Sequence, residues 1–194
     1  MTIPEFDVIV SDDADEEVAR GSVGEILIRS HVPFTTMTGY FGMPEATAEA
    51  TRNFWFHSGD LGRMDKDGNL YFVGRKKEAI RRRGENISAF EVEEGVLLHP
   101  DIIECAAVGV PSDLSEEDVK IFVVLRQGSR LTAADIHQHC KNTLARFQLP
   151  RYIEIVDSLP KTPTGKLEKY RLKELPRGES EWESDTAPDQ NARL

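Results

Sequence analysis

The sequence predicts an α+β fold in which a β-hairpin and a three-stranded sheet pack with helices, preceded by a β-rich segment. Short apolar runs alternate with turn residues over residues 6–73, as is typical of strands. Helical spacing with capping residues appears only after residue 87. The run DVKIFVVLR at 118–126 is nearly continuous in apolar residues, which favours a strand buried on both faces of its sheet.

The first segment contains strand-like runs and one short helical run. Strands are expected at 6–10, 24–30 and 70–74, with a helix from Pro44 to Thr51, and NFWFHSGDLG at 53–62 leads to a turn at MDKDGN. So few strands would leave exposed edges and half of a hydrophobic core. This segment is therefore expected to be part of something larger.

The second segment begins with a predicted β-hairpin, in which AIRRR and ENIS flank Gly84. Ser88 and Glu91 have the spacing of a capping box for a helix that stops before Pro100. Strands are then expected at 104–111 and 118–126. The predicted order of hairpin, helix, two strands, helix, strand, loop and helix describes a compact domain.

The second helix of this domain has a clear buried face. Thr132 and Asp135 are placed to cap it. Apolar residues follow at spacings of four, four and three, which defines one face: Ile136, Cys140, Leu144 and Phe147. A third strand, RYIEIVDSLP, a loop, KTPTGK, and a short helix at 167–175 complete the pattern.

These patterns divide the chain into four parts. Residues 1–73 form the β-rich segment, 74–78 the boundary and 79–175 the second domain. Residues 176–194 lack periodicity and are polar, so a disordered tail is expected there.

Composition excludes several classes of protein. The formal net charge of −10 argues against general nucleic-acid binding, which normally requires a basic face. No apolar run is long enough to cross a bilayer, and the N-terminus lacks the pattern of a signal peptide, so a cytoplasmic protein is expected. Cys105 and Cys140 fall in a predicted strand and a predicted helix, which favours two buried, reduced thiols.

The positive charge of this acidic chain gathers in GRKKEAIRRRGENIS, residues 74–88, with six cations: Arg75, Lys76, Lys77, Arg81, Arg82 and Arg83. In a strand, Arg81 and Arg83 would share one face, where like charges repel unless an anion lies nearby. A solvated hairpin tip is the alternative.

Two further polar clusters are candidate sites. Prolines and a glycine around Lys166 predict a loop that presents one ammonium group to a phosphate or carboxylate, although a simple solvated lysine fits the same pattern. Asp60, after Ser58 and Gly59, either accepts hydrogen bonds from a sugar or starts a turn. His137 and His139 are two positions apart on a helix and point to different faces, so no metal site is predicted from them.

The order of these clusters resembles one known family. SGD, then GRKKEAIRRRGENISAFEVE about fourteen residues later, then PKTPTGK are similar to the (S/T)GD, GRx(D/K)(D/E)xI(K/R)xxGxxIxxxEVE and PxTxxGK motifs of the adenylate-forming superfamily. That superfamily includes acyl-CoA synthetases, peptide adenylation domains and luciferases. The resemblance covers residues 6–175, and IRRRGENIS and LPKTPTGKLEK look most like acyl-CoA ligases of the crotonobetaine/carnitine type.

The resemblance implies roles for the residues in matching positions. Asp60 and Arg75 would contact the ribose of ATP, and Asn86 would contact its phosphate. Lys77 would be the hinge about which the small C-terminal domain rotates between two half-reactions.

Three other positions would act in one half-reaction each. Arg83 and Gly84 would line the tunnel for the pantetheine arm of CoA, where a glycine leaves room for close approach. Lys166 would be the mobile catalytic lysine that stabilises the charge developing during adenylation.

The implied reaction converts a carboxylic acid and ATP to an acyl-adenylate and pyrophosphate, and then joins the acyl group to CoA with release of AMP. The family's phosphate loop, acyl pocket and Mg²⁺ contacts belong to a large N-terminal domain, of which residues 1–73 match only the last subdomain. The chain is thus expected to be a fragment that is inactive alone. Two alternatives are a docking module that complements a separately encoded N-terminal domain and a nucleic-acid binder that uses Arg81, Arg82 and Arg83, against which the net charge argues.

Overall fold

The computed structural model describes residues 4–113, 116–176, 178 and 180–184. The chain divides into two compact units, one ending at Lys77 and the other beginning at Glu78. This division lies inside the range 74–78, where the sequence predicts the hinge.

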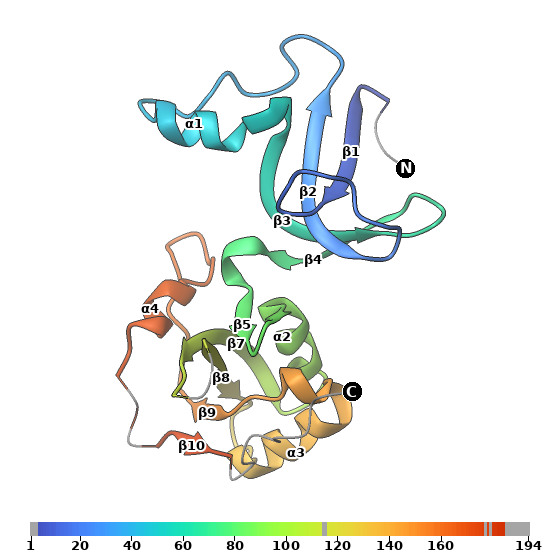
Figure 1. Cartoon of the computed structure of the whole chain (residues 1–194). Helices are drawn as coiled ribbons and strands as arrows, with labels where there is room; N and C mark the ends of the chain where they lie inside the picture. The colour runs from blue at the N-terminus through green and yellow to red at the C-terminus, as the bar shows by residue number, and fades with distance from the viewer. Residues whose placement is uncertain (1–3, 114–115, 177, 179, 185–194) are drawn as a thin grey trace. The chain divides into compact units, whose positions relative to one another are not determined.

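The first unit is built on a four-stranded antiparallel sheet in the order β1-β2-β3-β4 (Figure 1). Its strands are β1 (Phe6–Ser11), β2 (Val23–Ser30), β3 (Phe56–Met64) and β4 (Leu70–Arg75). The helix α1 (Pro44–Ala50) and the 3₁₀ turn η1 (Arg52–Phe54) connect β2 to β3. A second 3₁₀ turn, η2 (Lys76–Glu78), follows β4.

The core of this unit is small. The buried apolar side chains are Val10, Ile26, Leu27, Met64 and Val73. Large apolar side chains between β2 and β3 face solvent instead, and Phe34, Phe41 and Phe54 are at least 91% exposed. This exposure is what an unfinished core would give, and the assignment of the segment to a larger domain stays a prediction.

The second unit contains a mixed four-stranded sheet in the order β10-β9-β8-β7 and a separate hairpin (Figure 1). The sheet strands are β7 (Ile102–Pro111), β8 (Glu117–Leu125), β9 (Tyr152–Ile155) and β10 (Trp182–Glu183). The hairpin strands are β5 (Ile80–Arg82) and β6 (Glu85–Ile87), and the helices are α2 (Ala89–Leu97), α3 (Ala133–Thr143) and α4 (Lys169–Lys173). A 3₁₀ turn, η3 (Arg146–Gln148), follows α3.

The position of β8 between two other strands accounts for its nearly continuous apolar sequence. It pairs with β7 antiparallel and with β9 parallel, and both of its faces are buried. Val119, Ile121 and Val123 face a core shared with the hairpin, α2 and α3, whereas Phe122 and Val124 face a second core with Leu159 and Leu172 of α4. Successive side chains of a strand point to opposite faces, so burial on both faces requires a continuous apolar run.

The helix caps agree with the sequence, but one predicted buried position is wrong. Thr132 and Asp135 form a reciprocal capping box at the start of α3. The α3 helix ends at Thr143, so Phe147 lies in η3 and is 47% exposed. The 3.6-residue period does not continue beyond the end of the helix.

The prediction of a tail without structure from Pro176 onward is wrong for residues 182–183. Trp182 pairs with Ile153, and Glu183 pairs with Tyr152, so β10 adds a fourth strand to the predicted three-stranded sheet. The Trp182 ring lies 5.0 Å from the ring of the buried His137 and packs against the core of the second unit. Residues 185–194 lie outside the described part of the chain.

Candidate active-site residues

Asp60 lies at a bulge that the SGD motif creates in β3. The register of β3 against β2 shifts between Leu27, opposite His57, and Glu25, opposite Leu61. Gly59 has φ +71°, a conformation that glycine adopts without strain. Ser58 Oγ donates to Ile26 O at 2.7 Å and accepts from Asp60 N at 3.1 Å. The motif therefore turns the strand locally and fixes the backbone of Asp60.

Arg75 lies directly opposite Asp60 in the β3–β4 ladder. Its Nε is 2.8 Å from Asp60 Oδ1, which makes an ion pair by distance. The structure thus brings Asp60 and Arg75 together, with the Asp60 side chain 29% exposed.

A buried cluster of charged side chains lies behind this bulge, and sequence reasoning missed it. Glu25 is 5% exposed, and its carboxylate accepts hydrogen bonds from Gly59 N at 3.1 Å and from Lys76 Nζ at 3.0 Å. His57 Nδ1 lies 3.4 Å from Glu25, and Arg52 lies 3.9 Å from it. Burial, the largest influence, raises the pKa of the Glu25 carboxyl, but hydrogen bonds from Lys76 and His57 outweigh it and leave the pKa lowered. Glu25 is therefore an ionised group that supports both the bulge and Lys76.

The cations of residues 74–88 do not all face a ligand. Arg82 turns inward, where its Nε lies 3.1 Å from Asp118 and its Nη1 donates to the carbonyls of Phe147 and Leu149 at 3.2 and 2.9 Å. Asp118 is 2% exposed and also binds Arg151 at 2.7 Å. The buried carboxylate of Asp118 thus partly offsets the repulsion between the positive charges of the hairpin.

Arg83 and Gly84 form the tip of the hairpin. Both have positive φ, +54° and +81°, which is the geometry of a type I′ turn. A Cβ added to Gly84 would meet nothing within 4 Å, so the glycine is required here by backbone conformation and leaves open space beside the turn. Asn86 and Arg83 are exposed, and the backbone N–H of Arg83 donates to Glu116 Oε2 at 3.0 Å, whereas its guanidinium has no ion-pair partner within the described residues.

Lys166 lies in a turn held by Thr162. Thr162 N donates to Lys166 O at 2.8 Å, and Thr162 Oγ1 accepts from Lys166 N at 3.1 Å. Gly165 has φ +83° within this turn. Lys161 and Lys169 each bind a carboxylate, whereas the exposed Lys166 has no side-chain partner within residues that the structure describes. The turn therefore presents one unpaired ammonium group to solvent.

The predicted site residues fall in both units. Asp60, Arg75 and Lys77 lie in the first unit. The second unit contains the other four: Arg83, Gly84, Asn86 and Lys166. Among these seven residues, and within the part of the chain that the structure describes, Asp60 and Arg75 form the one side-chain ion pair.

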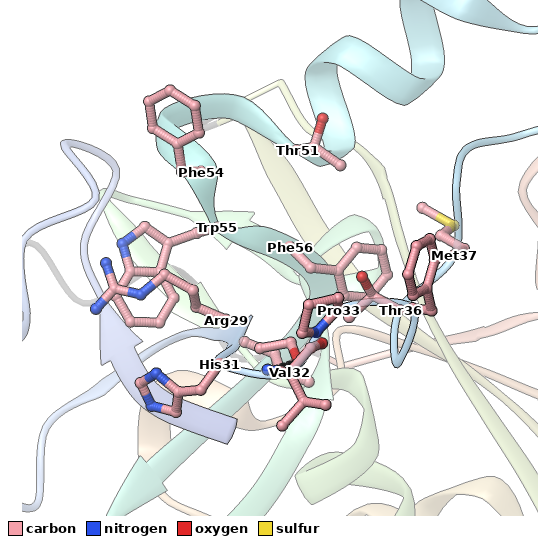
Figure 2. Close-up of a pocket in the computed structure, with 13 residues that line it drawn as sticks. Arg29, His31, Val32, Pro33, Thr36, Met37, Thr51, Phe54, Trp55 and Phe56 are labelled. Atoms are coloured by element: carbon pink, nitrogen blue, oxygen red, sulfur yellow. Dashed lines mark hydrogen bonds between the residues drawn. The ribbon is translucent and has the colours of Figure 1, made fainter. Parts of the chain in front are cut away.

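A hollow on the first unit is lined mainly by apolar and aromatic side chains (Figure 2). Figure 2 shows Arg29 beside Trp55, and the guanidinium carbon lies 4.2 Å from the ring centroid. Phe56 and Met37 also line this hollow. None of the predicted site residues lines it, and the sequence showed it only as scattered apolar residues within a connecting segment.

Within residues 4–113, 116–176, 178 and 180–184, no group of three or more His, Cys, Asp or Glu side chains is placed to hold a metal ion. No described helix combines the length and apolarity that a bilayer crossing requires. Cys105 and Cys140 are buried and unpaired, as the sequence predicts, and burial raises the pKa of both thiols.

Comparison with known proteins identifies the second unit. Residues 91–166 match the family model described as the AMP-binding enzyme C-terminal domain. The chain is 37% identical over 169 residues to the crotonobetaine/carnitine–CoA ligase of Salmonella typhimurium strain LT2, which is 87% of this chain and 33% of that protein. It is 39% identical over 178 residues to the long-chain-fatty-acid–CoA ligase of Escherichia coli O157:H7, covering 92% of this chain and 31% of that protein.

Solved structures agree with the sequence comparisons. An amide bond synthetase from Marinactinospora thermotolerans superposes with a TM-score of 0.78 at 34% identity, over 87% of this chain and 34% of that one. The o-succinylbenzoate CoA synthetase of Bacillus subtilis, solved with its acyl-adenylate intermediate, superposes with a TM-score of 0.82 at 28% identity. The superposition covers 91% of this chain and 35% of that one. The chain spans about a third of the length of these relatives.

Proposed function

The chain belongs to the AMP-binding, adenylate-forming enzymes, of which it carries the C-terminal domain, and from this premise we propose that it is the C-terminal portion of an acyl-CoA ligase. In this proposal a carboxylate attacks the α-phosphate of ATP to give an acyl-adenylate and pyrophosphate. The thiol of CoA then attacks the acyl carbon, and AMP leaves. The chain alone is inactive, because it spans about a third of its ligase relatives.

The observation that carries the proposal is the exposed, unpaired ammonium group of Lys166. A fixed turn presents it, while the neighbouring Lys161 and Lys169 are held by carboxylates. During adenylation, negative charge builds up on the α-phosphate and the attacking carboxylate. A positioned cation lowers the energy of that transition state more than the energy of the ground state. Lys166 is the residue assigned to this step.

The geometry of the first unit supports ribose binding by Asp60. The Asp60 side chain is 29% exposed, so its carboxylate can accept a hydrogen bond from a ribose hydroxyl. Arg75, with Nε 2.8 Å from Asp60 Oδ1, holds the carboxylate in place. Asn86, exposed on the hairpin, is assigned to a phosphate of the nucleotide. Mg²⁺ bound to ATP is assigned to the part of the enzyme that precedes this chain in its relatives.

The tip of the hairpin is assigned to the second half-reaction. The space beside Gly84 admits the pantetheine arm, and the exposed guanidinium of Arg83 attracts the phosphates of CoA. Lys77 is the hinge that brings this face into use after adenylation. A cytoplasmic location is proposed because both thiols of the chain are unpaired.

A second candidate function follows from the apolar surface of the first unit. Phe34, Phe41 and Phe54 are almost fully exposed, which is unusual for a surface in contact with water. This surface favours docking onto a separately encoded N-terminal part. The chain would then complete an enzyme made of two polypeptides.

The test is complementation. The chain is joined to, or mixed with, the N-terminal two thirds of the crotonobetaine/carnitine–CoA ligase, and ATP–pyrophosphate exchange and CoA thioester formation are measured. The proposal predicts no activity for the chain alone and activity in the fused protein, whereas activity after simple mixing supports the docking alternative. Exchange by the chain alone, or a folded fusion without thioester formation, would contradict the proposal.

A further inference from the structure

A short segment, residues 181–184, covers one edge of the sheet in the second unit, and we call it the strap. It contains β10, which pairs antiparallel with β9, and Ser184 N extends the contact by donating to Arg151 O at 2.9 Å. On its other side β9 pairs with β8. An open strand edge readily accepts an extended segment, so the strap occupies a position that suits strand pairing.

The first two side chains of the strap reach opposite faces of the sheet, as successive residues of a strand do. Glu181 forms an ion pair with Lys120, which lies over the ring of Phe122 and is 4% exposed. Trp182 packs on the other face, against the core that contains Ile153, with its ring 5.0 Å from that of His137. The edge of β9 thus offers the strap a buried cation on one face and an apolar slot on the other.

The third side chain of the strap meets a second cation. Glu183 Oε1 accepts from both Nε and Nη2 of Arg151, at 3.0 and 2.7 Å. The Glu183 side chain is 44% exposed, whereas that of Glu181 is 7% exposed, so the pair with Lys120 is the better shielded of the two. Three consecutive residues therefore have three different partners on the body of the second unit.

The charges show that the contact is specific. The chain has a formal net charge of −10, so an acidic segment is repelled by most of its surface. Only a local concentration of positive charge can hold two carboxylates there, and Lys120 and Arg151 supply it. Because a buried ammonium group is costly unless it is paired, Lys120 favours a carboxylate at the position of Glu181.

We propose that the edge of β9 is a docking site for an extended segment that carries an aromatic residue between two carboxylates, and that the strap fills this site in cis as a releasable ligand. Backbone pairing would supply affinity, and the three side-chain places would supply specificity. Two ladder pairs alone form a weak attachment, so the strap can open without unfolding of the sheet. The strap lies outside residues 91–166, which match the family model, and its docking does not depend on acyl-CoA formation.

The first test measures hydrogen exchange at the Ser184 amide, which the docked strap protects. Exchange in the wild-type chain should be at least about 10-fold slower than in a free peptide, and Trp182→Ala should abolish this protection while circular dichroism stays unchanged. If Trp182→Ala does not fold, the chain with Glu181→Gln and Glu183→Gln replaces it here and in the binding assay. Lys161→Met, which breaks a salt bridge on β7, is the matched control and should retain the protection.

The second test asks whether the site binds the same sequence in trans. A dye-labelled peptide of residues 178–186, GESEWESDT, is titrated with the full-length chain, and fluorescence anisotropy is recorded. The Trp182→Ala chain should bind the peptide about 10-fold more tightly than the wild type does, because a tethered strap competes at an effective concentration on the order of mM. A peptide with Glu181→Gln and Glu183→Gln should bind about 10-fold more weakly, and a scrambled peptide of equal charge should not bind.

Four results would overturn the proposal. They are an unprotected Ser184 amide in the wild type, no saturable binding of the peptide to the folded Trp182→Ala chain, equal affinity of the wild-type and Trp182→Ala chains, and equal affinity for the scrambled peptide. A wild-type dimer in sedimentation, dissociated by Trp182→Ala, would also overturn filling in cis, because the strap would then bind a second copy of the chain.

Discussion

Replacement of Asp118 by alanine should strongly destabilise the second unit. The Asp118 carboxylate is 2% exposed, binds Arg151 Nη1 at 2.7 Å, lies 3.1 Å from Arg82 Nε and accepts from Ser112 Oγ at 2.6 Å. Its removal leaves two partly buried guanidinium groups without their main anion. Breaking a buried ion pair costs about 3–5 kcal/mol. The side chains of Arg82 and Arg151 are 17% and 23% exposed, so we expect a loss in the free energy of unfolding at the lower end of this range, about 3 kcal/mol.

The pH dependence of this effect has a definite sign. Burial is the largest influence and raises the pKa of Asp118, but hydrogen bonds from Ser112 and Arg151 and the charge of Arg82 outweigh it, so the pKa is lowered in the folded chain. A carboxyl with a lowered pKa stabilises the fold above its unfolded pKa, about 3.9, and loses that contribution as the pH falls through the folded value. The difference between wild type and Asp118→Ala should therefore be constant from about pH 5 to 8 and shrink below about pH 4.

The assay is urea unfolding followed by tryptophan fluorescence. The chain has two tryptophans, Trp55 in the first unit and Trp182 in the second, so a Trp55→Phe background reports the second unit alone. With a slope of about 1.5 kcal/mol/M, a loss of ~3 kcal/mol lowers the midpoint by about 2 M. Asp113→Ala, at an exposed aspartate, is the control and should change the free energy of unfolding by less than about 0.5 kcal/mol. A midpoint for Asp118→Ala equal to that of the control at pH 7, or a difference from the wild type that does not decrease between about pH 5 and pH 2, would refute the reasoning.

Three further predictions concern stability. The pKa of Asp65 is lowered to about 2, chiefly by hydrogen bonds from the side chain and backbone of Asn69, so the melting temperature of the first unit should fall between pH 4 and 2, and Asp65→Asn, but not Asp67→Asn, should reduce this fall, the rest of which comes from Asp7, Asp15 and Glu25, whose pKa values are also lowered. A Cβ at Gly95 would lie 2.3 Å from Leu144 Cδ2, so Gly95→Ala should cost about 1–3 kcal/mol in urea unfolding; an unchanged midpoint would mean that Leu144 moves freely aside. Hydrogen exchange should be faster over residues 4–73 than over 78–175, and uniform strong protection would contradict the view of an unfinished first unit.

Local patterns in the sequence predicted most elements, because their causes are local. The capping pair Thr132 and Asp135, the positive-φ turn at Gly84 and the continuous apolar run of β8 each depend on neighbouring residues. The strand at Trp182 was not predictable in this way, because two residues form it only by pairing with β9, far earlier in the chain.

The candidate site likewise contains features that the sequence predicted and features that only the fold brings together. The motif positions Asp60 and Lys166 were visible in the sequence, and the structure adds an ion pair with Arg75 at the first and, within the described residues, an unpaired ammonium group at the second. The inward turn of Arg82 toward Asp118 was not visible, because the two residues are brought together only by the fold. The buried carboxylate of Glu25 was missed for the same reason: nothing in GEILIRS distinguishes it from an exposed strand residue.

The central claim is that two loops of the second unit act in different half-reactions. It is tested most directly in the fusion with a ligase N-terminal part, by measuring ATP–pyrophosphate exchange and CoA-dependent consumption of preformed acyl-adenylate for Lys166→Ala and Gly84→Leu. Lys166→Ala should lower exchange by about 10²-fold to 10³-fold and spare transfer to CoA, because one preorganised charge is lost from adenylation alone. Gly84→Leu should retain exchange and lose transfer, since a branched side chain fills the open space beside the turn. Loss of both activities in equal proportion by both variants, with circular dichroism showing them folded, would contradict the claim.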